Sequence, residues 1–388
     1  MKRLTAVVLF LGILVTAGCS RKLLVGVVLP ETGDAAIYGA SIKTGVKLCF
    51  DEAFAAKKAP QGLIVEYRDS GSDPARAASL AKSLYDEGAL VIIGGVTSAE
   101  ARAMIPIADR DERVLISPSA SAPDLARMSI YFYRMFPSDD LEGVKAADLL
   151  VMTRNAQKIL VIHEDNDYTR GLLPVFMGEI KHRGATVVGS VSMKDTNWRQ
   201  EVRDLLVAYQ PDGVYVCGYA DAILDGLQVL RSSDFKGTIC TTSAISTATA
   251  LQKAGKLAEG VFFPLASYDT SSTKEPVASF VREYYETYHL LPDTYAAHGY
   301  DAALATLYAL QNLHTRSGRE VQLRLKGLGN KQGVTGPLAF DDYGNIKHYP
   351  RNYWIRNNKI EDYDSYIHKE KERLRDEMMK LLRGAGDS

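Results

Sequence analysis

Hydroxyl-bearing residues follow two predicted strands, and they are the side chains best suited to hold a small anion. Residues 94–98 (GGVTS) end one apolar run, and Ser98 stands where the next predicted helix begins. A hydroxyl there can cap the helix, while the free N–H groups and the dipole of the first turn favour an anion. The next strand ends in SPSASAP, where Ser119, Ala120 and Ser121 permit close approach of the backbone to a ligand. A simple helix cap and a plain turn would use the same residue types.

Tyrosines form a second group at the same predicted sheet edge. Tyr38, Tyr168 and Tyr219 each follow an apolar run, and tyrosine is the commonest aromatic residue, with 21 against 11 phenylalanines and 2 tryptophans. A flat ring with a polar tip suits the wall of a cleft. Taken singly, a tyrosine is more often an ordinary surface or core residue than part of a cleft.

Motifs of enzymes and metal sites are absent or out of order. KTG at 43–45 precedes SLAK at 79–82, the reverse of the order in penicillin-binding enzymes, and no S-D-N element lies between them. The sequence has no G-x-S-x-G, H-E-x-x-H, Walker A or G-x-G-x-x-G motif. The acidic run at 164–167 lacks the alternation of an EF-hand loop. We therefore expect no enzyme activity, no cofactor and no metal.

The elements that must position these residues alternate between strand and helix. Short apolar runs separated by amphipathic stretches indicate parallel sheets covered on both faces. Because right-handed crossovers bring the carboxyl ends of all strands to one edge, the flagged loops should meet there. The alternation restarts after 136–138, so the sequence predicts an α/β protein with two doubly wound parallel-sheet lobes. The strand-like runs lie at 24–29, 63–68, 90–93, 114–116, 159–163, 186–191, 213–217, 238–241, 261–263 and 353–356.

The first twenty residues are a separate piece. Lys2 and Arg3 precede an apolar run at 4–15 that is too short for a confident transmembrane helix, which indicates a secretory signal. Residues 15–19 (VTAGC) are similar to a bacterial lipobox, so we expect cleavage after residue 18 and lipid on Cys19; a plain signal peptide with a chance cysteine is the alternative.

The remaining cysteines and the charge balance point to no further partner. Cys49, Cys217 and Cys240 are an odd number, which favours buried thiols over a disulfide framework, although Cys217 and Cys240 could be neighbours in one sheet. With 46 Lys and Arg against 47 Asp and Glu, the net charge of −1 gives no broad field for nucleic acid.

Nine segments of the chain resemble the periplasmic leucine/isoleucine/valine-binding protein family. They occur in order from about residue 24 to 359 and so cover nearly the whole mature chain; each alone is weak, but nine in register are specific. The segments are 29–39 (LPETGDAAIYG), 69–74 (DSGSDP), 92–95 (IIGG), 116–123 (ISPSASAP), 137–139 (PSD), 165–168 (DNDY), 211–219 (PDGVYVCGY), 300–302 (YDA) and 333–341 (GVTGPLAFD).

The resemblance implies a type I periplasmic binding fold, in which two lobes joined by three crossings trap a ligand by hinge closure. The crossings would lie near 136–138, 267 and 347. This divides the chain into a signal peptide and three further parts. The expected parts are 1–18 for the signal, 23–137 plus 268–346 for the N-terminal lobe, 138–267 plus 347–365 for the C-terminal lobe, and 366–388 for a charged, helical tail with an apolar stripe at Leu374, Met378 and Leu381.

The resemblance also implies roles for the flagged residues. Ser98 would hold the carboxylate of an amino acid, together with hydroxyl and main-chain groups around Ser119, Ala120 and Ser121. Tyr38, Tyr168 and Tyr219 match the tyrosines of the family's cleft. The chain departs from the family at one point: Ser243 stands where an acidic residue commonly pairs with the ligand's ammonium. Either another acid such as Asp221 or Asp269 substitutes, or the ligand lacks an α-amino group.

The implied protein is the solute-binding subunit of an ABC importer, anchored by lipid outside the cytoplasm. It would be a monomer that delivers a small amino acid, of the branched-chain type, to membrane permease subunits. Two alternatives remain: a binder of a carboxylic acid or amide without an α-amino group, and a ligand-sensing module for a membrane receptor.

Overall fold

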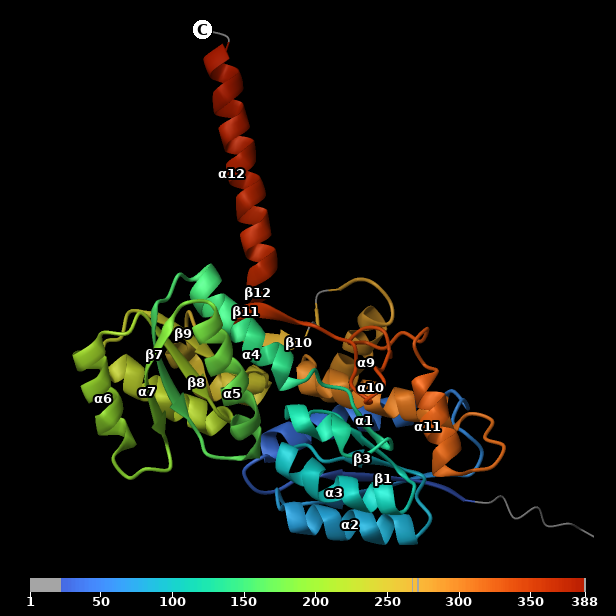
Figure 1. Ribbon diagram of the computed structural model, residues 1–388. Helices are drawn as coiled ribbons and strands as arrows, with labels where there is room; N and C mark the ends of the chain where they lie inside the picture. The colour runs from blue at the N-terminus through green and yellow to red at the C-terminus, as the bar shows by residue number, and fades with distance from the viewer. Residues whose placement is uncertain (1–21, 267, 271, 387–388) are drawn as a thin grey trace, which may run out of the picture.

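A computed structural model describes residues 22–266, 268–270 and 272–386. The signal segment and Cys19 lie outside these residues. The described chain forms two lobes side by side, and a long C-terminal helix projects away from them (Figure 1). No helix among the described residues is long and apolar enough to cross a membrane.

The first lobe is built on a fully parallel sheet of five strands in the order β2-β1-β3-β4-β5. Its central strands consist almost entirely of buried apolar residues, because helices cover both faces. Helices α1 and α10 pack together on one side, and α2 and α3 pack together on the other. The strands are β1 (Leu23–Leu29), β2 (Leu63–Asp69), β3 (Val91–Gly94), β4 (Val114–Ser117) and β5 (Phe132–Arg134), and the helices are α1 (Ala36–Ala55), α2 (Pro74–Asp86), α3 (Ser98–Arg110), α9 (Val277–Tyr288), α10 (Thr294–Leu310) and α11 (Gly318–Lys326).

The second lobe is built on a sheet of seven strands in the order β12-β11-β10-β9-β8-β6-β7. Strands β6 to β10 are parallel, but β11 pairs antiparallel with β10, and β12 pairs antiparallel with β11. The strands are β6 (Lys158–His163), β7 (Thr186–Ser192), β8 (Gly213–Cys217), β9 (Thr238–Thr241), β10 (Phe262–Ala266), β11 (Pro350–Arg356) and β12 (Lys359–Asp362), and the helices are α4 (Asp139–Ala147), α5 (Asp167–His182), α6 (Trp198–Tyr209), α7 (Ala220–Ser232), α8 (Ala248–Ala254) and α12 (Tyr363–Gly386).

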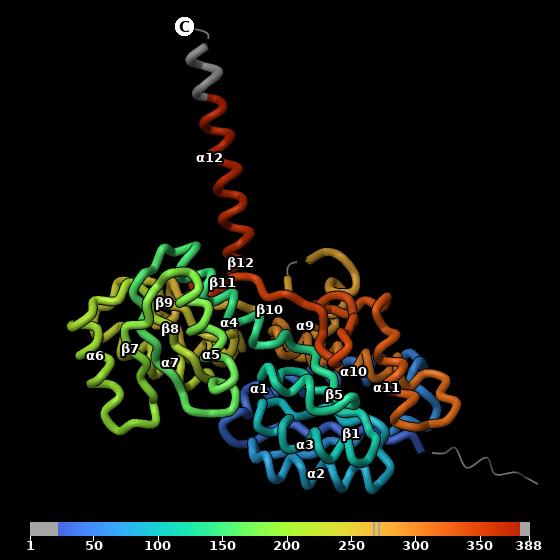
Figure 2. The backbone as a smooth tube through the Cα atoms, in the orientation of Figure 1, coloured from blue at the N-terminus to red at the C-terminus, as the bar shows by residue number. Residues whose placement is uncertain are grey.

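The chain passes between the lobes three times: after β5, after β10 and before β11 (Figure 2). The predicted fold class of two doubly wound lobes with three crossings is therefore confirmed. The prediction that both sheets are parallel is wrong only at one edge of the second sheet. There the chain returns from the first lobe and adds β11 and β12 as a hairpin, which needs no crossover helix and so runs antiparallel.

Capping side chains in the loops after the strands mark where the following helices begin. Asp73 accepts hydrogen bonds from the nitrogens of Ala75 and Arg76 at the start of α2, and Pro74 occupies the first helical position. Asn166 forms a reciprocal cap with Thr169 at the start of α5. The acidic run at 164–167 is thus a helix-capping loop.

Cys49, Cys217 and Cys240 are buried and free of disulfide bonds. Cys217 lies on β8 and Cys240 on the neighbouring strand β9, but Cys240 pairs with Tyr215, so the two cysteines are not opposite one another. The alternative that these two residues form a disulfide is wrong, and the preferred interpretation as buried thiols is confirmed.

The C-terminal helix α12 has 24 residues and begins at Tyr363, three residues before the start predicted for the tail. Leu374 and Met378 remain 55% and 57% exposed. The side chain of Leu381, the third member of the predicted apolar stripe, lies outside the described residues.

Candidate ligand-binding site

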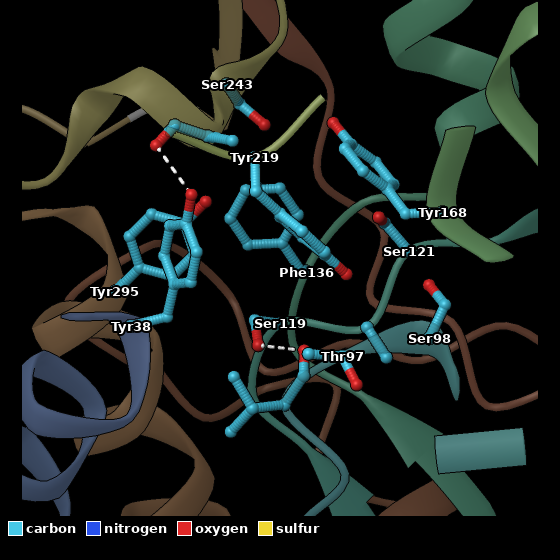
Figure 3. Close-up of a pocket in the computed structure, with 13 residues that line it drawn as sticks. Tyr38, Thr97, Ser98, Ser119, Ser121, Phe136, Tyr168, Tyr219, Ser243 and Tyr295 are labelled. Atoms are coloured by element: carbon cyan, nitrogen blue, oxygen red, sulfur yellow. Dashed lines mark hydrogen bonds between the residues drawn. The ribbon is translucent and has the colours of Figure 1, made fainter. Parts of the chain in front are cut away.

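A cavity lies between the two lobes at the carboxyl ends of their strands (Figure 3). All eight ligand-binding residues predicted from the sequence line it. The first lobe contributes Tyr38, Val96, Thr97, Ser98, Ser119, Ala120, Ser121, Phe136 and Tyr295, and the second contributes Tyr168, Tyr219, Ser243 and Ala244.

The loop between β3 and α3 brings the backbone close to this cavity. Gly95 has a φ of +70°, and a Cβ atom there would lie 2.8 Å from the Cα of Ala101. Glycine is therefore required, because other residues rarely adopt this conformation and their side chains would meet the helix. The turn places Ser98 as the first residue of α3.

Thr97, and not Ser98, caps helix α3. The Thr97 hydroxyl accepts a hydrogen bond from the Glu100 nitrogen at 3.1 Å, and the Glu100 carboxylate accepts one from the Thr97 nitrogen at 3.1 Å. The expectation that Ser98 caps the helix is wrong, because Thr97 has the extended backbone that a cap requires and a glutamate three positions later completes the box.

The hydroxyl proton of Ser98 is available for an acceptor in the cavity. The side chain is 2% exposed, and its oxygen accepts a hydrogen bond from the Ala122 nitrogen at 3.2 Å. A hydroxyl has one proton to donate, and an accepted hydrogen bond leaves that proton available. Ser98 can therefore donate into the cavity, beside the N–H groups of the first turn of α3.

The loop after β4 contributes mainly its backbone and shape. The Ser119 hydroxyl donates to the Val96 carbonyl at 2.7 Å, so its proton is already used (Figure 3). The Ser117 oxygen accepts from the Ala120 nitrogen at 2.9 Å and its hydroxyl donates to the Gly95 carbonyl at 2.7 Å. These bonds hold the two loops of the first lobe against each other.

Tyr38 joins the two lobes across the cavity. Its hydroxyl accepts a hydrogen bond from the Ala220 nitrogen at 2.8 Å. It also donates one to the Ala244 carbonyl at 3.1 Å (Figure 3). Burial raises the pKa of Tyr38, so the phenol stays neutral and can make both bonds. Its ring lies against those of Tyr295 and Tyr219, with centroid distances of 4.9 and 5.7 Å.

Aromatic rings form most of the remaining wall. Tyr168 and Tyr219 stack at 5.5 Å and 16°, and Phe136 and Tyr295 stack at 5.8 Å and 14°. Phe136 and Tyr295 were not predicted. Phe136 borders the first crossing, which could have drawn attention to it, whereas Tyr295 opens a helix far along the chain that carries no strand-end signal.

Three other lining residues were not predicted as site residues. Val96 and Thr97 belong to the loop at 94–98, which the sequence predicts to lie at the site, although Ser98 is the only residue of this loop that is predicted to bind the ligand. Ala244 follows Ser243 in a 3₁₀ turn after β9.

Ser243 donates hydrogen bonds to a buried carboxylate of the second lobe. The Ser243 nitrogen and hydroxyl donate to Glu142 at 2.9 and 2.8 Å, and the Tyr168 hydroxyl donates to the same carboxylate at 3.3 Å. Glu142 lies on α4 and is 5% exposed, and burial raises its pKa to about 7. Sequence reasoning missed Glu142, because it follows no strand end and matches no motif.

The two acids suggested from the sequence as substitutes at this point do not line the cavity. The Asp221 side chain is 76% exposed and pairs with Lys253 at 3.1 Å. Asp269 is also exposed. The expectation that either takes the place of the family's acidic residue is therefore not supported by their positions.

Comparison with known proteins places this geometry among solute-binding proteins. A family model described as periplasmic binding protein matches residues 22–357. The chain is 26% identical over 330 residues to the Leu/Ile/Val/Thr-binding protein of Salmonella typhimurium, covering 83% of this chain and 88% of the relative. It is 26% identical over 294 residues to the leucine-specific-binding protein of the same organism, covering 73% and 76%.

Solved structures share the fold. A branched-chain amino acid transporter substrate binding protein from Streptococcus pneumoniae, in complex with isoleucine, has a TM-score of 0.80 at 23% identity and covers 88% of this chain and 98% of its own. A solute binding protein from R. palustris, in complex with benzoate, has a TM-score of 0.79 at 19% identity, covering 88% and 95%.

Proposed function

The chain belongs to the periplasmic binding protein family, and from this premise we propose that it is the extracytoplasmic solute-binding subunit of an ABC importer. Its ligand would be a small amino acid of the branched-chain type. The observation that carries the proposal is the cavity between the lobes, whose two ends differ in hydrogen-bonding character. One of the relatives is named for leucine, isoleucine, valine and threonine, and another for leucine alone.

The end of the cavity formed by the first lobe would bind the ligand's carboxylate. Ser98 has a hydroxyl proton to donate, and it stands in the first turn of α3. Charge-assisted hydrogen bonds and the dipole of this helix stabilise an anion without a buried arginine. The Ser119 hydroxyl donates its proton to the Val96 carbonyl, so it would stabilise the loop and would not donate to the ligand.

The aromatic wall would receive the ligand's side chain. Phe136, Tyr295 and Tyr219 line the cavity with their rings; the first two are buried and Tyr219 is half-buried, which limits the access of water. Contact between an aliphatic side chain and such rings contributes about 25 cal/mol for each Å² of apolar surface removed from water. An aliphatic amino acid therefore fits this wall better than a charged one.

Closure of the lobes would be the functional step, and no bond of the ligand would change. The hydrogen bonds that the Tyr38 hydroxyl accepts from Ala220 and donates to Ala244 join opposite lobes, as does the ion pair of Arg102 with Asp167 at 3.1 Å. A ligand that contacts both lobes stabilises the closed form over the open one. The permease would then recognise the closed form.

The N-terminal segment would send the protein out of the cytoplasm to the periplasm, where its lipid would anchor it to a membrane. We propose cleavage after residue 18 and lipid attachment to Cys19, with the two lobes acting as a monomer. A sensory role at a membrane receptor is the competing use of the same fold. Uptake of labelled ligand by cells with and without the gene separates import from sensing.

A second candidate ligand is a carboxylic acid without an α-amino group. Ser243 in place of an acidic residue favours it, and the R. palustris neighbour was solved with benzoate. Such a ligand would use the Ser98 end of the cavity in the same way and would leave the Ser243 end to apolar or neutral contacts.

Calorimetry of the mature protein tests both candidates. Bound ligand is first removed by unfolding and refolding, and the protein is then titrated with leucine, isoleucine, valine, other amino acids and their deaminated analogues. Binding of branched-chain amino acids supports the proposal, and tighter binding of the deaminated acids supports the second candidate. If no compound in the panel produces heat or raises the melting temperature, solute binding of this class is contradicted.

A further inference from the structure

Two buried carboxylates stand directly behind the second lobe's wall of the cavity. Asp139 and Glu142 are three residues apart in α4, and they are 0% and 5% exposed. Buried carboxylates are costly unless they are paired with a cation or satisfied by hydrogen bonds. Neither residue was assigned a role in the proposed function.

Glu142 determines how two hydroxyls face the cavity. An ionised carboxylate can only accept hydrogen bonds, so the hydroxyls of Ser243 and Tyr168 direct their single protons to it, at 2.8 and 3.3 Å. Each oxygen then has only lone pairs to offer the cavity. This end of the cavity therefore accepts hydrogen bonds, whereas the Ser98 end donates them.

Asp139 contacts the first lobe's side of the cavity through its backbone. Its nitrogen donates to the carbonyl of Ser121, a lining residue, at 2.9 Å. Both carboxylate oxygens are buried without a hydrogen-bond partner among the described residues. Burial, followed by the charge of Glu142, raises the pKa of Asp139, and the nearby Ser121 side chain only partly offsets this.

The charges around the pair do not balance. Arg134 is the buried cation beside Asp139, and its side chain donates to the Ala122 carbonyl at 2.9 Å and to Asn345 at 2.7 Å. The two carboxylates of the pair thus share one buried guanidinium, which lies on the Asp139 side. The other titratable groups around Glu142 are kept neutral by burial, which raises the pKa of each; they are Tyr168, Tyr215, Cys217, Cys240 and Tyr295.

We propose that Glu142 supplies the negative charge for the ligand's α-ammonium, which binds to the acceptor faces of the Ser243 and Tyr168 hydroxyls. The charge that the family places on the residue at position 243 would thus come from α4. This inference rests on the proposed function and narrows it. The site then selects an amino acid over the same acid without its amino group, because only the ammonium donates hydrogen bonds and balances the pair.

The test compares leucine with 4-methylpentanoate, which is leucine without its amino group. Affinities for both are measured by calorimetry for the wild type, for Glu142→Gln and for Asp140→Asn. Asp140 is the exposed acid on the same helix, so its substitution removes the same charge without touching the cavity wall. We expect Glu142→Gln to bind leucine about tenfold to a hundredfold more weakly and to change 4-methylpentanoate by less than about threefold. Asp140→Asn should keep the wild-type ratio.

Three results would overturn the inference. If Glu142→Gln loses affinity equally for both ligands, Glu142 acts only on the structure of the site. If its affinity for leucine is unchanged, the charge of Glu142 does not contribute to binding of the ammonium. A wild type that prefers 4-methylpentanoate would exclude ammonium recognition while leaving solute binding intact. A wild type that binds neither compound, nor any other of the panel, would instead refute the proposed function itself.

A second variant guards against a folding defect in Glu142→Gln. Ser243→Ala removes one hydroxyl and keeps the carboxylate, and Ser243 is a small residue in a short turn. We expect this variant to lose affinity for leucine and to keep that for 4-methylpentanoate. Equal affinities to the wild type for both ligands would contradict the proposed contact.

Discussion

The Tyr38 hydroxyl of the first lobe lies 2.8 Å from the Ala220 nitrogen and 3.1 Å from the Ala244 carbonyl of the second lobe. One side chain thus satisfies a donor and an acceptor that belong to two different loops across the cavity. In an open form these backbone groups would be hydrated, so the hydrogen bonds stabilise the closed form specifically.

Replacement of Tyr38 by phenylalanine should weaken ligand binding without unfolding the protein. The ring keeps its contacts with Tyr295 and Tyr219, but the closed form leaves a buried donor and acceptor unpaired, which costs about 1–3 kcal/mol. Affinity should fall about 5-fold to 150-fold, mainly through faster dissociation. Stopped-flow kinetics and calorimetry measure this. An unchanged dissociation rate would mean that the hydroxyl does not hold the lobes together.

Ser98 and Ser119 should differ in their effect on binding, although both are serines on the same wall. Ser98→Ala removes a hydroxyl whose proton is available for a carboxylate, a bond worth about 1.5–3 kcal/mol, so affinity should fall about 10-fold to 150-fold. Ser119→Ala removes a hydroxyl that donates to Val96 and should cost less. Calorimetry with leucine compares the two. Equal losses would show that carboxylate recognition does not centre on Ser98.

The ion pair of Arg102 with Asp167 should contribute little, and only at low salt. It joins α3 to α5 across the cleft, but the two side chains are 35% and 30% exposed. Such pairs are worth about 0–1 kcal/mol, and salt screens them. Asp167→Asn should weaken binding less than about fivefold at low ionic strength and not at all in about 1 M salt. A large loss that persists in high salt would indicate a role beyond surface electrostatics.

Binding of leucine should strengthen as the pH rises through neutrality. Glu142 has a pKa of about 7, above its ordinary value of 4.5, so it holds a proton in the ligand-free protein at lower pH. Ionised Glu142 is the form that pairs with an ammonium. The affinity for leucine should therefore decrease as the pH is lowered from about 8 to about 5.5, by up to about tenfold for each pH unit below 7.

The stability of the ligand-free protein should show the opposite trend. Between pH 4.5 and 7 the folded form retains the Glu142 proton that the unfolded form loses, so the contribution of this group to stability is lost as pH rises through that window. Glu142→Gln removes both trends in calorimetry and in thermal unfolding. Trends of wild-type size in this variant would assign them to another group, foremost Asp139.

The thiols of Cys49, Cys217 and Cys240 should react with a thiol reagent only after unfolding. All three are buried and free of disulfides, and burial raises the pKa of each well above its ordinary value. The thiolate is the reactive form, so labelling of the native protein should be slow. The measurement is reagent uptake by the mature protein, carrying Cys19→Ser, before and after addition of guanidinium. Rapid labelling of the native form would contradict the burial of these residues.

Several parts of the site were predictable because they depend on local rules. The loops at 94–98 and 117–123 follow buried strands, and the carboxyl ends of parallel strands meet at one edge of a sheet, so Ser98, Ser119, Ala120 and Ser121 had to lie together. The position of Thr97 as the helix cap was open to the same reasoning, because Glu100 completes its capping box. The choice of Ser98 as the cap was an error of one residue.

Other parts depend on contacts that no local pattern records. Tyr295 reaches the cavity because α10 packs on α1, more than two hundred residues earlier in the chain. Glu142 reaches Ser243 because α4 begins directly after the first crossing and packs on β10, beside the 3₁₀ turn that follows β9. The antiparallel hairpin of β11 and β12 likewise depends on where the chain returns from the first lobe.

The sequence by itself determined the two-lobed α/β architecture and the donor end of the cavity, since hydrophobic period, helix starts and strand ends are properties of adjacent residues. Only the tertiary structure decided the acceptor end. A hydroxyl can donate or accept, and the sequence does not say which. The buried carboxylate of Glu142, 101 positions from Ser243 in the chain, accepts the hydrogen bonds of the two hydroxyls, so their oxygens have only lone pairs to offer the cavity.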